Sequence, residues 1–182
     1  MAIRKVARMG HPVLRLKARK IETPELRSPE FRAVLRDMFE TLEEYEGIGI
    51  AAPQIRESMA VAIIAYPSDE EPKVIINPEI TVLDSTLQGY WEGCLSIPEL
   101  RGLVYRPRKV RIEYMDLNGR QQVIEPEGFE ATVYQHELDH LFGVLFVDRV
   151  KFAPGESPIA FTGEYARYHA PGEDDEVGEL DD

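Results

Sequence analysis

The chain contains a single cysteine, no long apolar run and no basic stripe. One thiol excludes a disulfide within the chain, and no apolar run approaches the roughly 18–20 residues of a transmembrane helix. The basic start from Met1 to Lys5 leads into no apolar segment of the kind that a secretory signal needs, so the cytoplasm is the expected location. The net charge of −12 disfavours direct binding of nucleic acid.

The length of 182 residues and a hydrophobic fraction of 43 % predict one well-packed domain, over residues 1–153. The composition changes at Pro154, and residues 154–182 are predicted to form a C-terminal extension. Its end, from Glu173 to Asp182, is acidic and lacks a hydrophobic face. Such a segment cannot bury enough apolar surface to order itself, so this tail is predicted to be disordered.

Two helices are predicted from local patterns. Ser28 and Pro29 suit the first positions of a helix, and apolar residues then recur at a spacing of three or four as far as Tyr45. Residues 129–141 contain neither glycine nor proline and predict a second helix, which stops near Gly143.

Short strands are predicted between these helices, at 60–64, 74–76, 80–83, 110–114 and 121–124. The first two are expected to end at Pro67 and Pro78, and Asn118-Gly119 predicts a hairpin turn between the last two. Antiparallel strands with two helices predict an α+β domain, in which the strands pack around a central helix, residues 129–141.

The strongest chemical signal is His136-Glu137-Leu138-Asp139-His140 in the second predicted helix. Residues four apart lie on one face of a helix, so both imidazoles can bind one metal ion. Glu137 lies next to the first of them and can act as acid and base on a metal-bound water. Hydrolytic metal centres usually have three protein ligands and one open position for water, so a further ligand is required.

Cys94 is the best candidate for this third ligand. Read alone, it suits a buried small side chain, a nucleophile or a metal ligand. Gly93 frees the backbone just before it, and a thiolate with two imidazoles suits zinc or ferrous iron. Glu156 and Glu164 are the alternatives, but a Pro-Gly pair precedes them and neither lies on a convincing helix.

A third segment, Gly47-Ile48-Gly49-Ile50-Ala51-Ala52-Pro53-Gln54, is rich in small residues. Small residues let another backbone approach closely, as when an extended peptide pairs alongside. A tight turn after the first helix would also account for the glycines. A phosphate-binding loop is disfavoured, because the segment has neither a Gly-Lys-Ser/Thr ending nor a G-x-G-x-x-G pattern.

The three segments G-I-G-I-A-A-P-Q, E-G-C-L-S and Q-H-E-L-D-H resemble the three motifs of the peptide deformylases in order and spacing. The resemblance covers roughly residues 4–150. It includes Gly10 to Arg15, similar to the family's N-terminal arm, and Leu141 to Phe146, similar to its strand after the metal-binding helix. It implies that residues 1–153 are a metal-dependent amide hydrolase, which removes the formyl group from the N-terminal formyl-methionine of newly made polypeptides and releases formate.

The partners that this resemblance implies are N-formylmethionyl peptides and nascent chains, processed co-translationally. Many bacterial members of the family end in a helix, basic in some, that docks at the ribosome. This chain ends in acidic residues, which disfavours a ribosome contact. No contact with a membrane is expected.

The resemblance also implies the roles of single residues. The ligands of one divalent metal ion would be Cys94, His136 and His140. The ion would natively be Fe²⁺, with Zn²⁺, Ni²⁺ or Co²⁺ as alternatives. Glu137 would take the proton of the attacking water and pass it to the departing amine. The side-chain amide of Gln54 and the backbone N–H of Leu95 would donate hydrogen bonds to the oxygen that becomes negative.

Substrate contacts follow from the same resemblance. The backbone of Gly49 would pair with the substrate peptide. The side chains that would line a methionine pocket are Ile48, Phe129 and Val133, although ordinary core packing accounts for them as well. Glu92 and Arg101 are expected to form an ion pair that steadies the Cys94 loop.

Two other hypotheses stay open from the residues. A zinc endopeptidase with a carboxylate as third ligand would not need Cys94. A catalytically silent peptide-binding module would keep the fold without the chemistry, but the presence of Glu137, Gln54 and all three ligand candidates argues against it.

Overall fold

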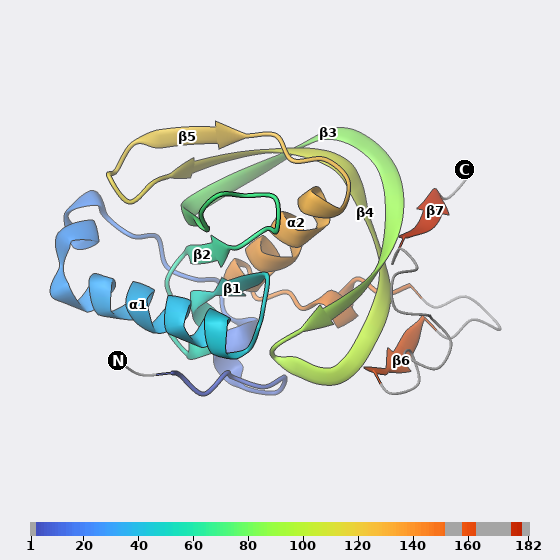
Figure 1. Ribbon diagram of the computed structural model, residues 1–182, viewed down its shortest axis with the longest axis horizontal. Coiled ribbons are helices and arrows are strands. Elements are labelled where there is room, and N and C mark those ends of the chain that lie inside the picture. The colour runs from blue at the N-terminus through green and yellow to red at the C-terminus, as the bar shows by residue number, and fades with distance from the viewer. Residues whose placement is uncertain (1–2, 152–157, 163–175, 180–182) are drawn as a thin grey trace.

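The computed structural model describes residues 3–151, 158–162 and 176–179 of the chain. These residues form an antiparallel sheet with two α-helices, α1 (Pro29–Glu44) and α2 (Phe129–Leu141), which confirms the α+β class (Figure 1). Both helices occupy the predicted ranges. No helix within the described ranges is both long and apolar enough to span a membrane.

The sheet is antiparallel throughout and has the strand order β1-β2-β3-β4-β5, which is also the order along the chain. These strands are β1 (Gly49–Ala51), β2 (Val61–Ile64), β3 (Lys73–Cys94), β4 (Ile97–Met115) and β5 (Gln121–Ile124). Two later strands, β6 (Ile159–Phe161) and β7 (Glu176–Glu179), pair with β4 and β3. Four 3₁₀ turns lie at Pro12–Arg15, Thr23–Arg27, Ala52–Ile55 and Phe146–Asp148.

The two α-helices cover opposite faces of the sheet near β2. Ile63 belongs to the apolar cluster that contains the buried face of α1, whereas Ile64 belongs to the cluster that contains Val133 and Leu138 of α2. Alternate residues of a strand face opposite sides, so a strand covered on both faces is apolar throughout. This arrangement explains the uninterrupted apolar run of β2.

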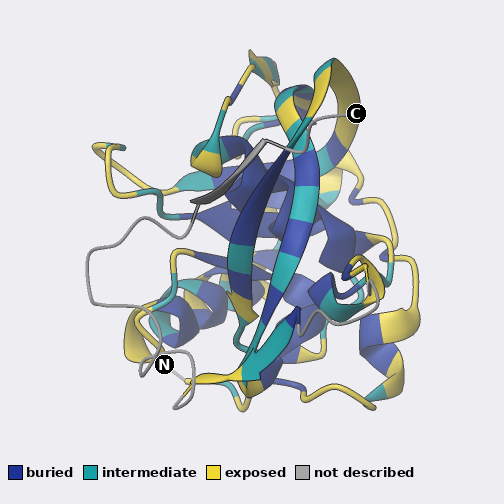
Figure 2. Cartoon of the chain, turned by 90° about the vertical axis from the view of Figure 1, so that its right-hand side faces the viewer, coloured by how far each residue is buried: buried dark blue, intermediate teal, exposed yellow. Residues whose placement is uncertain are grey.

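α1 begins as the sequence predicts, because the Oγ of Ser28 accepts a hydrogen bond from the backbone N–H of Phe31 at 3.1 Å. α2 differs from α1 in having no exposed face over most of its length: every residue from Ala131 to Leu141 is buried. It lies inside the curve of the long β3–β4 ribbon (Figure 1), and the burial pattern in Figure 2 shows the same enclosed core.

The prediction that a strand ends at Pro78 is wrong, since β3 continues through it to Cys94. The pairing of β3 with β4 shifts register between Ile76 and Glu79, which marks a bulge, and a bulge tolerates a proline that has no N–H to donate. Asn77 adopts a φ of 50° there. Its side chain exchanges two hydrogen bonds with the backbone of Ile21, at 2.9 and 2.7 Å, which fix this conformation.

The predicted strand from Leu141 to Phe146 is also wrong, because the chain turns at Gly143, whose φ is 76°, and then enters the 3₁₀ turn at Phe146. A Cβ on Gly143 would lie 2.7 Å from the backbone carbon of Arg15, so this turn packs directly on the N-terminal arm. Glu156 and Glu164 lie outside the described residues. Most of the predicted acidic tail does too, so its disorder stays a prediction, apart from Glu176–Glu179, which form β7.

Candidate metal centre

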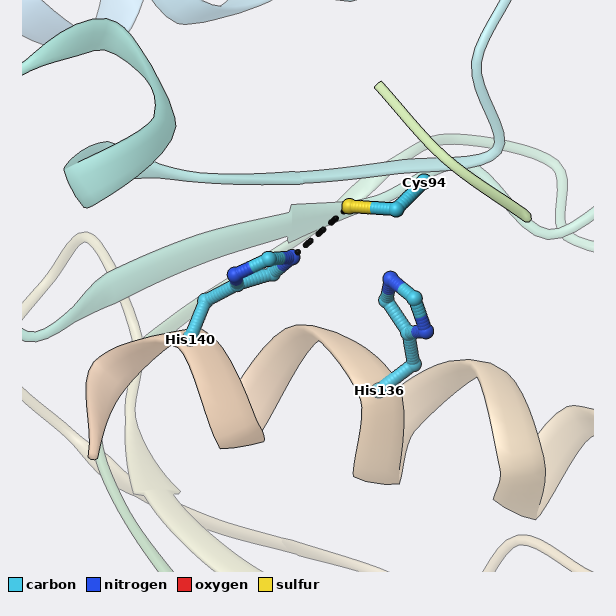
Figure 3. Close-up of side chains that lie close together, drawn as sticks. All are labelled: Cys94, His136 and His140. Carbon is cyan, nitrogen blue, oxygen red and sulfur yellow. Dashed lines mark hydrogen bonds between the residues drawn. The ribbon is translucent and has the colours of Figure 1, made fainter. Parts of the chain in front are cut away.

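Cys94, His136 and His140 come together although the first histidine follows the cysteine by 42 positions in the sequence. α2 presents both imidazoles on one face, and the end of β3 brings the thiol over them (Figure 3). The candidate ligand atoms all lie within 4.8 Å of one another, and Cys94 Sγ lies 3.3 Å from His140 Nε2. Metal bonds of about 2.3 Å to sulfur and about 2.0 Å to nitrogen at a tetrahedral angle would separate those two atoms by about 3.5 Å.

The outer nitrogen of His136 has a carboxylate partner. His136 Nδ1 lies 2.8 Å from Glu92 Oε2, and because a carboxylate only accepts, Nδ1 donates and the lone pair of Nε2 points to the thiol side. His140 Nδ1 is buried without a hydrogen-bond partner among the described residues. The donor set therefore fits a divalent metal ion, with one of its imidazoles oriented by a carboxylate.

Glu92 does not pair with Arg101, so that expectation is wrong. Its carboxylate is held instead by Arg106, at 2.5 and 3.0 Å, and Arg106 also contacts Asp139 at 2.8 Å. Burial alone would raise the pKa of Glu92, but the charge of Arg106 and hydrogen bonds from His136 and Arg106 lower it to about 2. The carboxylate therefore stays charged, and we call Glu92, Arg106 and Asp139 the buried charge network.

Glu137 faces the same space and packs against Gly49. A Cβ on Gly49 would lie 2.6 Å from Glu137 Cγ and 2.7 Å from its Oε1, so only glycine leaves room for this carboxylate. Glu137 Oε2 is buried and has no hydrogen-bond partner within the described residues. Burial raises the pKa of Glu137 to about 7, against a smaller lowering by His136. A carboxylate with such a pKa can both take and give a proton near neutral pH.

Gln54 is anchored so that its amide nitrogen faces the thiol. Its Oε1 accepts from the backbone N–H of Ala51 at 2.8 Å, and its Nε2 lies 3.6 Å from Cys94 Sγ and 3.4 Å from Ser96 Oγ. The side chain is 1 % exposed. A fixed, buried N–H donor of this kind can stabilise an oxygen that gains negative charge nearby.

The N-terminal arm ties these two segments together. The backbone N–H of Ala7 donates to Gln54 O at 2.7 Å, and that of Met9 donates to Ser96 O at 2.8 Å. Arg8 donates from its guanidinium to Leu95 O at 2.8 Å, which fixes the peptide after Cys94. The arm therefore holds both predicted oxyanion donors in place.

A cavity of about 450 Å³ opens beside this group, a size in the usual range for ligand sites. Nine of the ten residues predicted from the sequence line it, namely Ile48, Gly49, Gln54, Cys94, Leu95, Phe129, Val133, His136 and Glu137. The tenth, His140, is 1 % exposed, and its Nε2 lies 3.3 Å from the thiol. Phe129 packs on Tyr90, with 5.2 Å between ring centroids, and forms an apolar wall of the cavity.

Several features of the site were not predicted from the sequence. They are Arg106, its contact with Asp139, the contacts of the N-terminal arm, and Thr162, which also lines the cavity. Asp139 lies within the histidine motif, so its position could have been flagged. Arg106 carries no local signal, because its partners come from a neighbouring strand and from α2.

Comparison with known proteins finds a match over most of the described chain. The sequence profile described as polypeptide deformylase matches residues 3–154. The peptide deformylase of Leptospira biflexa is 42 % identical over 160 residues, which cover 83 % of this chain and 89 % of that protein.

Solved structures agree with the sequence comparison. Two are of the class I type b peptide deformylase from Acinetobacter baumannii. The form bound to actinonin is 38 % identical with a TM-score of 0.77 and covers 83 % of this chain and 100 % of its own. The form bound to Met-Ala-Ser is 37 % identical with a TM-score of 0.77, covering 82 % and 99 %. On both sequence and structure, the chain belongs to the peptide deformylase family.

Proposed function

We propose that this chain hydrolyses the N-formyl group of formyl-methionine at the start of newly made polypeptides and releases formate. The observation that carries the proposal is the convergence of Cys94, His136 and His140 with Glu137 and Gln54 on one cavity. Three soft or borderline ligands, one titratable carboxylate and one fixed amide donor are what metal-assisted amide hydrolysis requires.

Cys94, His136 and His140 would hold the metal on α2, which is then the metal-binding helix. When bound, a divalent ion would supply a Lewis acid that makes water acidic enough to attack at neutral pH. Glu137 would take the proton of the attacking water and deliver it to the nitrogen of the departing amine. Its burial and its pKa of about 7 support both halves of that role.

Two donors would stabilise the formyl oxygen as it becomes negative. One is Gln54 Nε2, which the hydrogen bond from Ala51 to Gln54 Oε1 keeps pointing at the site. The other is the backbone N–H of Leu95, in the peptide that Arg8 fixes through the Leu95 carbonyl. One such donor is typically worth about 3–4 kcal/mol of transition-state stabilisation.

The methionine side chain would enter the cavity between Ile48, Phe129 and Val133. Ile48 and Phe129 are 39 % and 36 % exposed, so they offer apolar surface to a ligand, whereas Val133 lies deeper at 5 %. The peptide would run beside the backbone of Gly49 in β1, the first strand of the sheet. Met-Ala-Ser, the peptide in the relative from Acinetobacter baumannii, is the size of product that this arrangement would release.

The decisive experiment compares formyl-Met-Ala-Ser with Met-Ala-Ser, using an assay coupled to formate. We expect formate from the first peptide only and no cleavage of internal bonds in either. Internal cleavage would favour the endopeptidase hypothesis, and no turnover of either peptide would favour the binding module.

The metal is proposed to be Fe²⁺, with Ni²⁺, Co²⁺ or Zn²⁺ able to replace it. Because Cys94 is the single cysteine, a thiol reagent reports on this ligand alone. We expect the thiol to react slowly in the anaerobically prepared iron protein and faster after a chelator removes the metal.

Cys94→Ala should lose metal and activity together, whereas His11→Ala, in the N-terminal arm, should keep both. Full metal content in Cys94→Ala would refute the thiolate ligand.

The domain boundary at 153, a cytoplasmic location and the lack of a ribosome contact complete the proposal. The family profile ends at residue 154, which supports the boundary. The acidic composition of residues 173–182 would repel the phosphates of ribosomal RNA, which supports the lack of a docking contact.

A further inference from the structure

The C-terminal extension contributes a strand to the neighbourhood of the cavity. β6 pairs antiparallel with the start of β4, with Phe161 opposite Leu100 and Ala160 opposite Arg101. The backbone N–H of Leu103 also donates to Pro158 O at 2.7 Å. Figure 1 shows β6 beside the lower end of the β3–β4 ribbon. The strand therefore covers an edge of β4 that would otherwise be open.

The two faces of β6 have different surroundings. Ile159 packs against the apolar cluster around Phe146 and Val150, and Phe161, on the same face two residues later, is 59 % exposed. The opposite face of the strand carries Ala160, and Thr162, the residue that follows β6, lines the cavity. Leu100, the β4 residue that pairs with Phe161, and Glu99 before it line the cavity as well.

This strand lies outside the part of the chain that the family profile matches, since the match ends at residue 154. Neighbouring strands are about 4.8 Å apart, so β6 lies one strand width beyond Leu100 and Arg101, which form a wall of the cavity together with Thr162. Gly93, next to Cys94, pairs with Arg101 of β4, and Arg101 pairs with Ala160, so β6 lies about two strand widths from the end of β3 that carries Cys94. A peptide whose first residue sits at the ligands would pass this wall with its later residues.

We infer that Thr162 is a specificity-determining residue, which contacts the substrate side chains that follow the formyl-methionine. The inference rests on the proposed deformylase function. β6 acts as the support for Thr162: Ile159 anchors the strand in the core, and the pairing with β4 sets its distance from the cavity.

The test exchanges charge at this position. Thr162→Glu and Thr162→Arg are compared with Phe161→Glu, which places the same charge as Thr162→Glu on the neighbouring residue, an exposed side chain that does not line the cavity. The substrates are formyl-Met-Ala amide, which is uncharged, and tripeptide amides in which Lys or Glu occupies the second or the third position. The measured quantity is kcat/KM for the Lys peptide divided by kcat/KM for the Glu peptide.

We expect Thr162→Glu to raise this ratio by roughly two- to fivefold and Thr162→Arg to lower it by as much, the range of an exposed ion pair. Formyl-Met-Ala amide, which carries no charge, should be cleaved at the parent rate by all three variants. An equal change in Phe161→Glu would show a long-range field effect and overturn the inference, as would an unchanged ratio in both Thr162 variants. A parent protein that releases no formate from formyl-Met-Ala amide would overturn the proposed function itself.

Discussion

A substitution of Glu137 can test its proposed catalytic role without changing the fold. It is 5 % exposed, and its Oε2 accepts no hydrogen bond within the described residues. Glu137→Gln keeps the shape of the side chain but removes its ability to carry a proton. We expect turnover to fall by roughly 100- to 10,000-fold, the usual contribution of general acid–base catalysis, while metal content stays at the parent level.

Metal content and turnover are measured on one preparation, with Glu130→Gln in the first turn of α2 as the matched control. Loss of metal together with activity would make Glu137 a ligand or a structural residue. Retained turnover would mean that another group moves the proton.

Gly49 is a second residue with a separable role. From the sequence, its small size was attributed to the approach of a substrate backbone, but the space above it is filled by Glu137, whose Cγ would lie 2.6 Å from a new Cβ. Gly49→Ala must therefore displace the carboxylate. We expect at least a tenfold loss of turnover with metal retained, because a misplaced base loses its proton-transfer geometry.

A double-mutant cycle with Glu137→Gln distinguishes the two roles of Gly49. If Gly49 acts through Glu137, adding Gly49→Ala to Glu137→Gln should cost little further turnover, since residues that act as a unit are non-additive. Fully additive losses would show that Gly49 serves the substrate backbone independently.

At the scale of elements, the buried charge network joins β3, β4 and α2 behind the metal ligands. Arg106 is 2 % exposed and contacts both Glu92 and Asp139. Arg106→Leu would leave two buried carboxylates without their shared partner, which typically costs about 3–5 kcal/mol of stability. For a domain of this size that corresponds to a fall in melting temperature of roughly 6–20 °C.

Arg111→Leu is the control, because Arg111 forms ion pairs with Glu113 and Glu125 at the surface. This substitution should lower the free energy of unfolding by no more than about 1 kcal/mol. Arg106→Lys, which keeps the charge but loses the paired donors, should melt between the parent and Arg106→Leu. A melting temperature of Arg106→Leu equal to that of the parent would show that the network adds no stability.

These elements also show what the sequence could predict. α1 and α2 follow from spacing, capping and the absence of breakers, which are local properties. β3 and β4 were predicted as short pieces, because Pro78 normally ends a strand and only the bulge at Asn77, held by Ile21, lets the strand continue. Arg106 could not be assigned a role, since its partners come from a neighbouring strand and from α2.

On the scale of the whole molecule, the predicted ligands and Glu137 lie between residues 94 and 140, whereas seven acidic residues gather at 173–182. Within that tail, β7 pairs with β3 at Gln88 and Tyr90, and Tyr90 precedes Cys94 by four strand residues, about 13 Å along the strand. Charge at this distance acts on charged ligands through the long-range field, which salt screens. The tail should therefore matter little to a small neutral substrate.

Deleting residues 173–182 removes seven acidic and no basic residues, which takes the formal net charge from −12 to −5. We expect kcat/KM for the neutral substrate formyl-Met-Ala amide to stay within twofold of the parent at physiological salt. A full-length control with the seven acidic residues changed to Asn or Gln separates loss of charge from loss of chain. A tenfold fall in kcat/KM of the deletion variant but not of that control would show that the β7 pairing supports the site through β3. A tenfold fall in both would show that the tail's charge acts on the chemistry, and either result would refute the prediction that the catalytic domain works without its tail.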